Sequence, residues 1–459
     1  MKIKEILDKI PNYKEFMTIE ELSKSSKKLA NEFESVEIFE IGKSKERRII
    51  NCLKIGNGNQ NALLIAFPHP NEPIGSLTVD FFSRFLAENP NLTKKMGFTW
   101  YLIYAIDIDG AILNEGWFKG KFDPIKHARN YYRPSMHEQV EWTFPINYKK
   151  LNFATPIPET QALINLINNT KPYFTYSLHN AGFCGVFYYV SKEIKKMCHE
   201  FIYLVKEEGL PIHEGEPEYP FIKKHSPGIY QSTGVKDTYD FMESIGIYDP
   251  TKLVNVGGSS YDYIKSVLPD DFFFLVCEMP YIYDKDLENK TYTEFNRRDV
   301  IIESLNYQEE IFRYITPIFK KIKQYSDKSS RLFSCVSSLI KDFRKLHKIQ
   351  LLHAKTSPTY EGKATIAEVF DSKVANKFTT LTSYSQLGRL LQEVSTIHPE
   401  KNSEFKEYQV DFEQMIEEKL KGLLQLTNYE IIPIQKLVKV QVGSCLIALK
   451  HLTKNFPIT

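Results

Sequence analysis

The sequence predicts an α/β fold, in which helices cover both faces of a sheet, followed by an all-α C-terminal unit. Up to about residue 290, short apolar or alternating segments typical of strands are separated by amphipathic segments typical of helices. Strands that alternate with helices indicate a sheet covered on both sides. From residue 300 to about 427 the alternating pattern is absent and apolar residues recur at helical spacing. A chain of 459 residues is also too long for one ordinary core, so we expect two units.

The elements of the first unit follow from local patterns. Residues 1–34 are predicted to form short amphipathic helices, and VEIFEIGKS and ERRIINCLKI alternate in polarity like a pair of strands. ALLIAF, residues 62–67, is typical of a fully buried strand. A helix is predicted after it, with Pro73 in its first turn and Asn89-Pro90 at its end. Four more apolar strands are predicted at FTWYLIYAID, YFTYSL, VFYYVS and FFFLVC.

The last third is predicted to be helical. RLFSCVSSLIKDFRKLHKI and FEQMIEEKLKGLLQL both carry apolar stripes at helical spacing. We therefore divide the chain into an N-terminal helical segment (1–34), an α/β domain (35–320) and a helical C-terminal domain (326–459). The stripes are most simply the core of a helix bundle. Two other roles for the stripes remain possible from the sequence: a contact surface in a homo-oligomer, and a lid over the functional site.

Composition narrows the partners and the compartment. The chain has 59 basic and 57 acidic residues, and this balance argues against a nucleic-acid partner bound through a broad basic surface. No run approaches the roughly 18 apolar residues that span a bilayer, and the charged N-terminus lacks a signal-peptide core. We expect no membrane association and a cytoplasmic location. The six cysteines contain no CxxC pair and are expected to be reduced.

Metal-ligating side chains follow three of the apolar strands. His69 and Glu72 come after ALLIAF, His179 comes after YFTYSL, and Glu278 comes after FFFLVC. In an open α/β sheet, ligands bind beyond the carboxyl ends of the strands. Two histidines and one glutamate around an open position are a ligand set of catalytic zinc. The sequence therefore predicts one zinc ion per chain, with a second glutamate available to accept a proton.

The motifs HPNE, SLHNAGF and LVCEMP together resemble the zinc carboxypeptidase family (M14 metallopeptidases). IDIDG, RNYYRP, TPIPETQALINLI and GGSSYDY resemble further segments of that family, although Asp107 and Ile108 replace its Asn-Pro. The resemblance covers roughly residues 35–320. It implies a mixed, mostly parallel twisted sheet and a zinc-dependent hydrolase of amide or peptide bonds.

The resemblance also implies a role for each site residue. His69, Glu72 and His179 would bind zinc, and Glu278 would be the general base. Arg129 fits the carbonyl-polarising arginine, with Arg133 as the fallback.

The sequence departs from the family where the substrate's terminal carboxylate is bound. The family uses an Asn-Arg pair, and Thr143 and Phe144 stand at these positions. Neither side chain can grip a carboxylate as an arginine fork does. The substrate is therefore expected to be a small peptide or an acylated amine, unless basic residues in FIKKHSPG bind the carboxylate. Arg133, Thr143 and Asn180 are the candidate substrate-binding residues, and Val254 stands where the family has a tyrosine.

Two alternatives remain beside a zinc peptidase or amidase. The chain could deacylate a small amino-acid derivative, as the related aspartoacylase and desuccinylase group does. It could also be a non-catalytic binding protein that uses the helical tail. Retention of His69, Glu72, His179 and Glu278 argues against the binding protein, and the missing Asn-Arg pair argues mildly for it.

Overall fold

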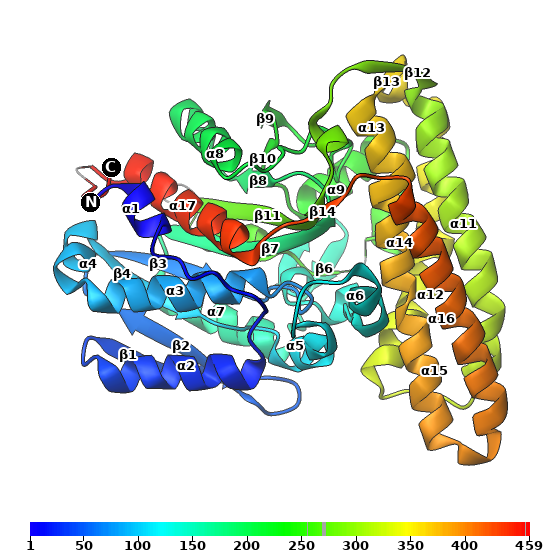
Figure 1. Cartoon of the computed structure of the whole chain (residues 1–459), viewed down its shortest axis with the longest axis horizontal. Coiled ribbons are helices and arrows are strands. Elements are labelled where there is room, and N and C mark those ends of the chain that lie inside the picture. The colour runs from blue at the N-terminus through cyan, green and yellow to red at the C-terminus, as the bar shows by residue number, and fades with distance from the viewer. Residues whose placement is uncertain (255, 269–271, 455) are drawn as a thin grey trace.

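The computed structural model describes residues 1–254, 256–268, 272–454 and 456–459. Within these residues the main sheet runs in the order β1-β2-β4-β3-β7-β11-β8-β10-β9, and β14 also pairs with β11 (Figure 1). The strands of this sheet are β1 (Val36–Lys43), β2 (Ile49–Ile55), β3 (Gln60–Ile65), β4 (Phe98–Ile103), β7 (Phe174–Phe183), β8 (Phe187–Val190), β9 (Lys224–Ser226), β10 (Ile229–Gln231), β11 (Phe273–Tyr283) and β14 (Glu430–Ile431). Two small ribbons pair β5 (Ile146–Tyr148) with β6 (Leu151–Phe153) and β12 (Tyr292–Asn296) with β13 (Lys363–Thr365).

The sheet is mixed and its centre is parallel, which confirms the predicted fold class. Strands β4, β3, β7 and β11 run parallel to their neighbours in this group. The pairs β1–β2, β2–β4, β8–β11 and β11–β14 are antiparallel. The central strands are apolar and buried because helices cover both of their faces.

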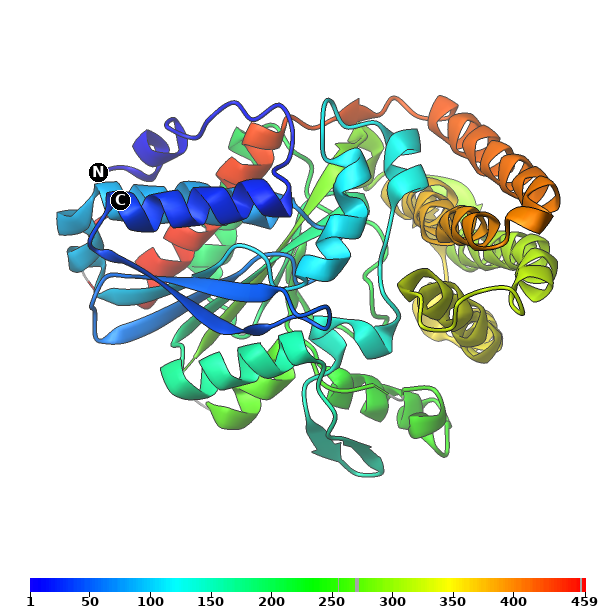
Figure 2. The ribbon, with the colours of Figure 1, turned by 90° about the horizontal axis from the view of Figure 1, so that it is seen from below.

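Helices pack on both sides of the sheet (Figure 2). The helices of the α/β domain are α1 (Ile3–Leu7), α2 (Ile19–Glu32), α3 (Ile74–Glu88), α4 (Pro90–Met96), α5 (Ile108–Asn114), α6 (Pro124–Asn130), α7 (Pro158–Thr170), α8 (Lys195–Glu207), α9 (Val235–Ser244), α10 (Ser260–Val267) and α17 (Ile434–Leu452). Helices α2, α3 and α17 lie on one face, and α7 and α10 lie on the other. A capping box between Thr18 and Glu21 begins α2, and Asp107 caps α5 through Gly110 N.

The remaining helices form a separate bundle beside the α/β domain (Figure 1). We call it the helical unit; it comprises α11 (Arg297–Ile322), α12 (Arg331–Thr356), α13 (Ile366–Phe370), the π-helical turn Asp371–Ala375, α14 (Asn376–Tyr384), α15 (Gln386–Ile397) and α16 (Asn402–Gln425). The apolar stripe of α16 is largely buried, and that of α12 is buried at Leu332 and Val336 and partly buried further along the helix. They therefore form bundle core, as the simplest interpretation of the sequence held.

The domain boundaries differ from the predicted division at 320–326. Helix α11 packs against α12 and α14, so it belongs to the helical unit. Helix α17 packs against α1, α3, α8 and β11, so it belongs to the α/β domain. Gln441 of α17 is buried, accepts a hydrogen bond from Thr78 (2.8 Å) and donates one to the carbonyl oxygen of His179 (3.1 Å). The helical unit is thus inserted between two parts of one domain.

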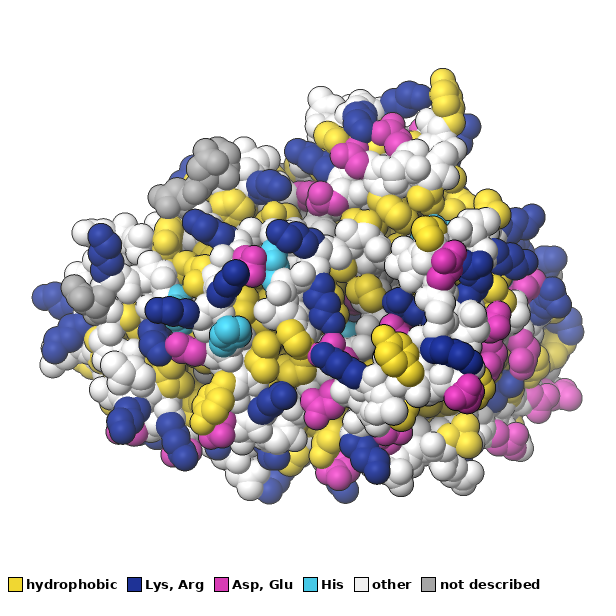
Figure 3. Space-filling model, turned by 90° about the horizontal axis from the view of Figure 1, so that it is seen from above, with side chains coloured by type: hydrophobic (Ala, Val, Ile, Leu, Met, Phe, Trp, Pro, Cys, Tyr) yellow, Lys and Arg dark blue, Asp and Glu magenta, His cyan; other side chains and the backbone are white. Residues whose placement is uncertain are grey.

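The surface agrees with the balanced composition. Figure 3 shows basic and acidic side chains interspersed on one face of the molecule. In the described part of the chain, no helix is long and apolar enough to cross a membrane.

Candidate metal centre and active site

The first two candidate ligands lie in the turn between β3 and α3. Strand β3 ends at Ile65 and α3 begins at Ile74, so His69 and Glu72 stand just beyond a buried strand. The start of α3 lies close to β7, since a Cβ placed on Gly75 would come within 2.6 Å of the Leu178 Cβ. Only glycine permits this approach, and it brings Glu72 beside His179.

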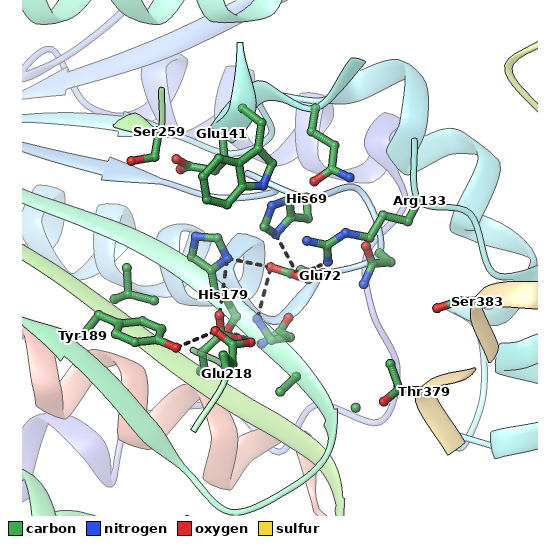
Figure 4. A pocket seen from close by; sticks show the side chains of 18 of the residues that line it. His69, Glu72, Arg133, Glu141, His179, Tyr189, Glu218, Ser259, Thr379 and Ser383 are labelled. Atoms are coloured by element: carbon green, nitrogen blue, oxygen red, sulfur yellow. Dashed lines mark hydrogen bonds and ion pairs between the residues drawn. The ribbon is translucent and has the colours of Figure 1, made fainter. Parts of the chain in front are cut away.

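His69, Glu72 and His179 converge on one point (Figure 4). Nδ1 of His69 lies 3.0 Å from Oε1 of Glu72, and Nδ1 of His179 lies 3.0 Å from Oε2 of Glu72. One ligand atom from each residue lies within 4.8 Å of the others, and all three residues are buried. Zinc bonds imidazole nitrogen and carboxylate oxygen at roughly 2.0–2.2 Å, so these atoms are within reach of a single ion. The donor set fits zinc.

Electrostatics at the group also suit a cation. Burial favours the neutral form of Glu72, but the two histidines outweigh it and hold its pKa below the usual range. Burial and the neighbouring Arg133 lower the pKa of His69 to about 3. Burial also disfavours charge on His179, but Glu72 raises its pKa to about 9. A buried anion thus lies between two imidazoles.

Glu278 joins this group from the neighbouring strand. It lies opposite His179 in the register of β11 and β7, with Oε1 of Glu278 3.7 Å from Nδ1 of His179. Burial raises the pKa of Glu278 well above its ordinary value, although His179 opposes the shift. The prediction placed both residues beyond strand ends, and this is wrong. Both lie within their strands, because β7 and β11 continue to pair from Phe273–Phe174 to Ile282–Phe183.

A chain of hydrogen bonds contacts the ring nitrogen of His179 that faces away from Glu72. Its Nε2 lies 2.9 Å from Oγ of Ser177, which donates to Oε1 of Glu141 (3.2 Å). Glu141 is buried and also accepts from the backbone N (2.8 Å) and Oγ (2.9 Å) of Ser260. Such contacts orient a ligating imidazole and increase its basicity. Sequence reasoning assigned neither Glu141 nor Ser177 to the site. The alternation of side chains in a strand could have indicated Ser177, because residues two apart face the same side.

The two candidate arginines have different surroundings. Nη1 of Arg133 lies 3.0 Å from Oε1 of Glu72, and Arg133 lines the cavity in front of the group. Arg129 is half exposed and pairs with Glu417 of α16. The structure therefore corrects the assignment of Arg129 as the carbonyl-polarising arginine and favours the fallback, Arg133. Arg129 is in the last turn of α6, whereas Arg133 follows the helix in an extended segment that enters the cavity.

The other candidate substrate-binding residues differ in position. Thr143 is fully buried, and its hydroxyl lies 2.6 Å from the Thr160 hydroxyl. Phe144 is also fully buried, so neither residue lines the cavity, and the assignment of Thr143 to substrate binding is corrected. Asn180 does line the cavity, but its Oδ1 accepts from the backbone N of Ile74 (3.0 Å) and its own N donates to Glu72 (3.2 Å). Asn180 supports Glu72.

The cavity in front of the group has a volume of about 530 Å³. Phe378, Thr379, Thr382 and Ser383 of the helical unit form part of its wall. Figure 4 shows Thr379 and Ser383 on this side of the cavity. Glu218 and Tyr219, in the loop after α8, are also part of the wall. Sequence reasoning missed all six of these residues, because no motif marks a wall assembled from distant segments.

Two further expectations concern residues around the cavity. Among its described lining residues, Arg133 is the sole lysine or arginine. Lys223, Lys224 and His225 are not part of the lining, and Lys224 pairs with Glu214 (2.7 Å). Val254 is buried in a small apolar cluster with Ile146 and Tyr239. Neither the basic side chains of FIKKHSPG nor Val254, which stands in place of the family's tyrosine, lines the cavity.

A buried His-Glu-His group on the parallel centre of a mixed sheet, with a carboxylate and an arginine at an open cavity, is typical of zinc-dependent hydrolases. The model of the zinc carboxypeptidase family matches residues 22–267, which is more than half of the sequence. The chain belongs to the zinc carboxypeptidase family.

The solved structures to which the chain is similar include two metallocarboxypeptidases. A metallo-carboxypeptidase from Burkholderia cenocepacia is 16% identical, with a TM-score of 0.35 over 57% of this chain and 60% of that one. Carboxypeptidase A from Helicoverpa armigera is 15% identical, with a TM-score of 0.38 over 58% of this chain and 65% of that one. The match thus spans less than two thirds of either structure. No curated protein matches the chain.

Proposed function

We propose that the protein is a zinc-dependent hydrolase that cleaves an amide or peptide bond of a small peptide or an acylated amine. The observation that carries this proposal is the convergence of His69, Glu72 and His179, with Glu278 beside them, at a cavity of about 530 Å³. The family supports a zinc-dependent peptidase. One zinc ion per chain would be held by the two histidines and Glu72.

The surrounding residues have distinct roles in this reaction. Zinc, when bound, supplies a Lewis acid that polarises a carbonyl oxygen and makes water more acidic. Glu278 accepts a proton from the attacking water and passes it to the nitrogen of the departing amine as the C–N bond breaks. Arg133 donates hydrogen bonds to the carbonyl oxygen as negative charge develops there. The Ser177–Glu141 chain keeps the His179 ring in place.

The charges around the cavity bear on the substrate. Thr143 and Phe144 are buried where the family would bind a terminal carboxylate, and Arg133 already contacts Glu72. Glu218 lines the cavity and accepts a hydrogen bond from Tyr189. We therefore infer that the departing part of the substrate is neutral or carries an amine, and does not present a free carboxylate.

The wall from the helical unit favours a small substrate over a long polypeptide. Deacylation of a small amino-acid derivative uses the same chemistry and remains the second candidate. All six cysteines are free and buried. Free cysteines are usual in the reducing cytoplasm, which is the location we propose. We also propose that the protein can form a homo-oligomer through the helical unit.

A matched substrate series tests the function. Purified protein with its zinc content measured would be assayed on N-acyl dipeptides, the same compounds with an amidated C-terminus, and N-acylated diamines. We expect zinc-dependent hydrolysis, with a higher kcat/KM for the amidated and amine-bearing compounds, and loss of hydrolysis in Glu278→Gln. A preference for the free carboxylate would contradict the substrate assignment. Lack of zinc binding by the protein, even after zinc is added, would contradict the function.

A further inference from the structure

We propose that the helical unit is a working part of the active site, because Gln386 and Arg389 of α15 position Arg133. The effect of this positioning on catalysis rests on the proposed function. The effect on the position of the segment 130–133 does not, and it can be tested without measuring turnover. Gln386 and Arg389 are positioning residues, since they touch the backbone of this segment and Arg133 faces the cavity.

The contacts run from α15 to the backbone of the arginine segment. Oε1 of Gln386 accepts a hydrogen bond from the backbone N of Arg133 at 2.9 Å. Nη1 of Arg389 donates to the carbonyl oxygens of Asn130 (3.0 Å) and Tyr131 (3.2 Å). Helix α6 ends at Asn130, where carbonyl groups lack partners within the helix, so a cation here also stabilises the helix end.

Further hydrogen bonds within the helical unit fix the side chain of Gln386. Gln386 is almost fully buried, and its Oε1 also accepts from Sγ of Cys335 on α12 at 3.1 Å. Its Nε2 donates to the carbonyl oxygen of Ser383 at 3.0 Å, which fixes the orientation of the amide. The bundle therefore defines where the backbone N of Arg133 lies.

The α/β domain holds the residues on either side of Arg133, and Nε2 of Gln139 donates to the carbonyl oxygen of Pro134 at 2.8 Å. Glu72 of the same domain pairs with the Arg133 guanidinium at 3.0 Å. Asn114 of α5 donates to the Tyr132 carbonyl oxygen (2.8 Å) and accepts from the Tyr132 backbone N (3.0 Å). The backbone N of Arg133 itself donates to Gln386 of the helical unit. A guanidinium that stabilises charge must be placed to within a fraction of an ångström, and a misplacement of about 1 Å can cost roughly a hundredfold in rate.

The first test measures the segment directly. Hydrogen–deuterium exchange of residues 128–139 would be compared in the full-length wild type, Gln386→Ala and Arg389→Ala. The matched control is Arg313→Ala, which removes an exposed arginine of α11 that pairs within its own helix with Glu309. We expect faster exchange at the Arg133 amide in both α15 variants and no change in the control. Unchanged exchange in the α15 variants would overturn the inference whatever the enzyme hydrolyses.

The second test asks whether positioning matters for turnover. Arg389→Ala should lower kcat by about tenfold to a hundredfold with little change in KM or zinc content, and Arg389→Lys should recover part of the loss. In an Arg133→Ala background the same change should have little further effect, because the group being positioned is gone. An equal loss in both backgrounds would mean a general structural role and would overturn the inference. A wild type that neither binds zinc nor hydrolyses amides would contradict the proposed function and leave the exchange result to decide the spatial claim.

Discussion

Glu278 on β11 stands directly opposite His179 on β7, with 3.7 Å between Oε1 of the glutamate and Nδ1 of the histidine. Adjacent parallel strands thus present a candidate proton acceptor and a candidate metal ligand side by side. Strand pairing fixes their separation more tightly than two loops could. A change to one residue should therefore leave the position of the other intact, so the two roles can be separated by mutation.

Replacing Glu278 by glutamine should abolish turnover and retain zinc. Glutamine has nearly the same shape but cannot accept a proton, so kcat should fall by at least about 10²–10⁴-fold. Zinc content per chain and steady-state kinetics on the best amide substrate check this. His69→Ala is the counterpart and should lose zinc as well, because two protein ligands would remain. Activity close to wild type in Glu278→Gln would remove this residue from the mechanism.

Removing the hydroxyl of Ser177 should weaken zinc binding and leave the fold intact. Without that hydroxyl the His179 ring loses its 2.9 Å contact and its link to Glu141. Loss of such a contact typically lowers metal affinity by about 10–100-fold. Competition with a chromogenic zinc chelator measures the affinity of wild type and Ser177→Ala. Ser266→Ala provides a control, since that exposed hydroxyl contacts its own helix at Tyr263. Equal affinities in all three proteins would rule out a supporting role for Ser177.

The two arginines should respond differently to alanine. Arg133→Ala removes the guanidinium beside Glu72 and should lower kcat by about 10²–10³-fold. Arg129→Ala removes a half-exposed pair with Glu417, which contributes at most about 1 kcal/mol to stability and nothing to the chemistry. Measuring kcat and the thermal melting temperature of both variants shows which arginine takes part in the reaction. A kinetic loss in Arg129→Ala that exceeds the loss in Arg133→Ala would restore the original assignment.

Asp107→Asn should stabilise the protein at neutral pH and above. Asp107 is buried, its Oδ2 has no hydrogen-bond partner among the described residues, and burial raises its pKa from 3.8 to about 7. Between these values the folded state holds a proton that the unfolded chain releases, so stability falls as pH rises through this window. Asparagine carries no such charge and can still accept from Gly110 N.

Urea denaturation at several pH values measures the effect of this substitution. The variant should gain about 1–4 kcal/mol over wild type at pH 8 and nothing comparable at pH 4. A gain that does not depend on pH would show that the charge of Asp107 is not its cause.

The central fold and the converging ligands could be predicted from sequence because both depend on local patterns. A short, fully apolar run such as ALLIAF predicts a buried strand on its own. Side chains that follow parallel strands gather at one edge of the sheet. The predicted positions of His179 and Glu278 were less accurate, since the sequence does not show how far β7 and β11 continue to pair.

The choice between Arg129 and Arg133 could not be made from sequence for a different reason. The segment that carries Arg133 is held by Gln386 and Arg389, more than 250 residues further along the chain. The placement of α17 depends in the same way on distant partners: its apolar pattern predicts a helix but does not say which face of which domain it covers.

The return of α17 to the sheet has a consequence for biosynthesis. Gln441 donates to the carbonyl oxygen of His179, so the backbone of a candidate ligand finds this partner in a segment made some 260 residues later. A nascent chain that has already emerged through β11 still exposes the apolar surfaces of α3 and β11 that α17 will cover. Assembly of the site therefore waits for translation of the whole inserted bundle, and ribosomes that stall within it would leave a chain suited to capture by chaperones.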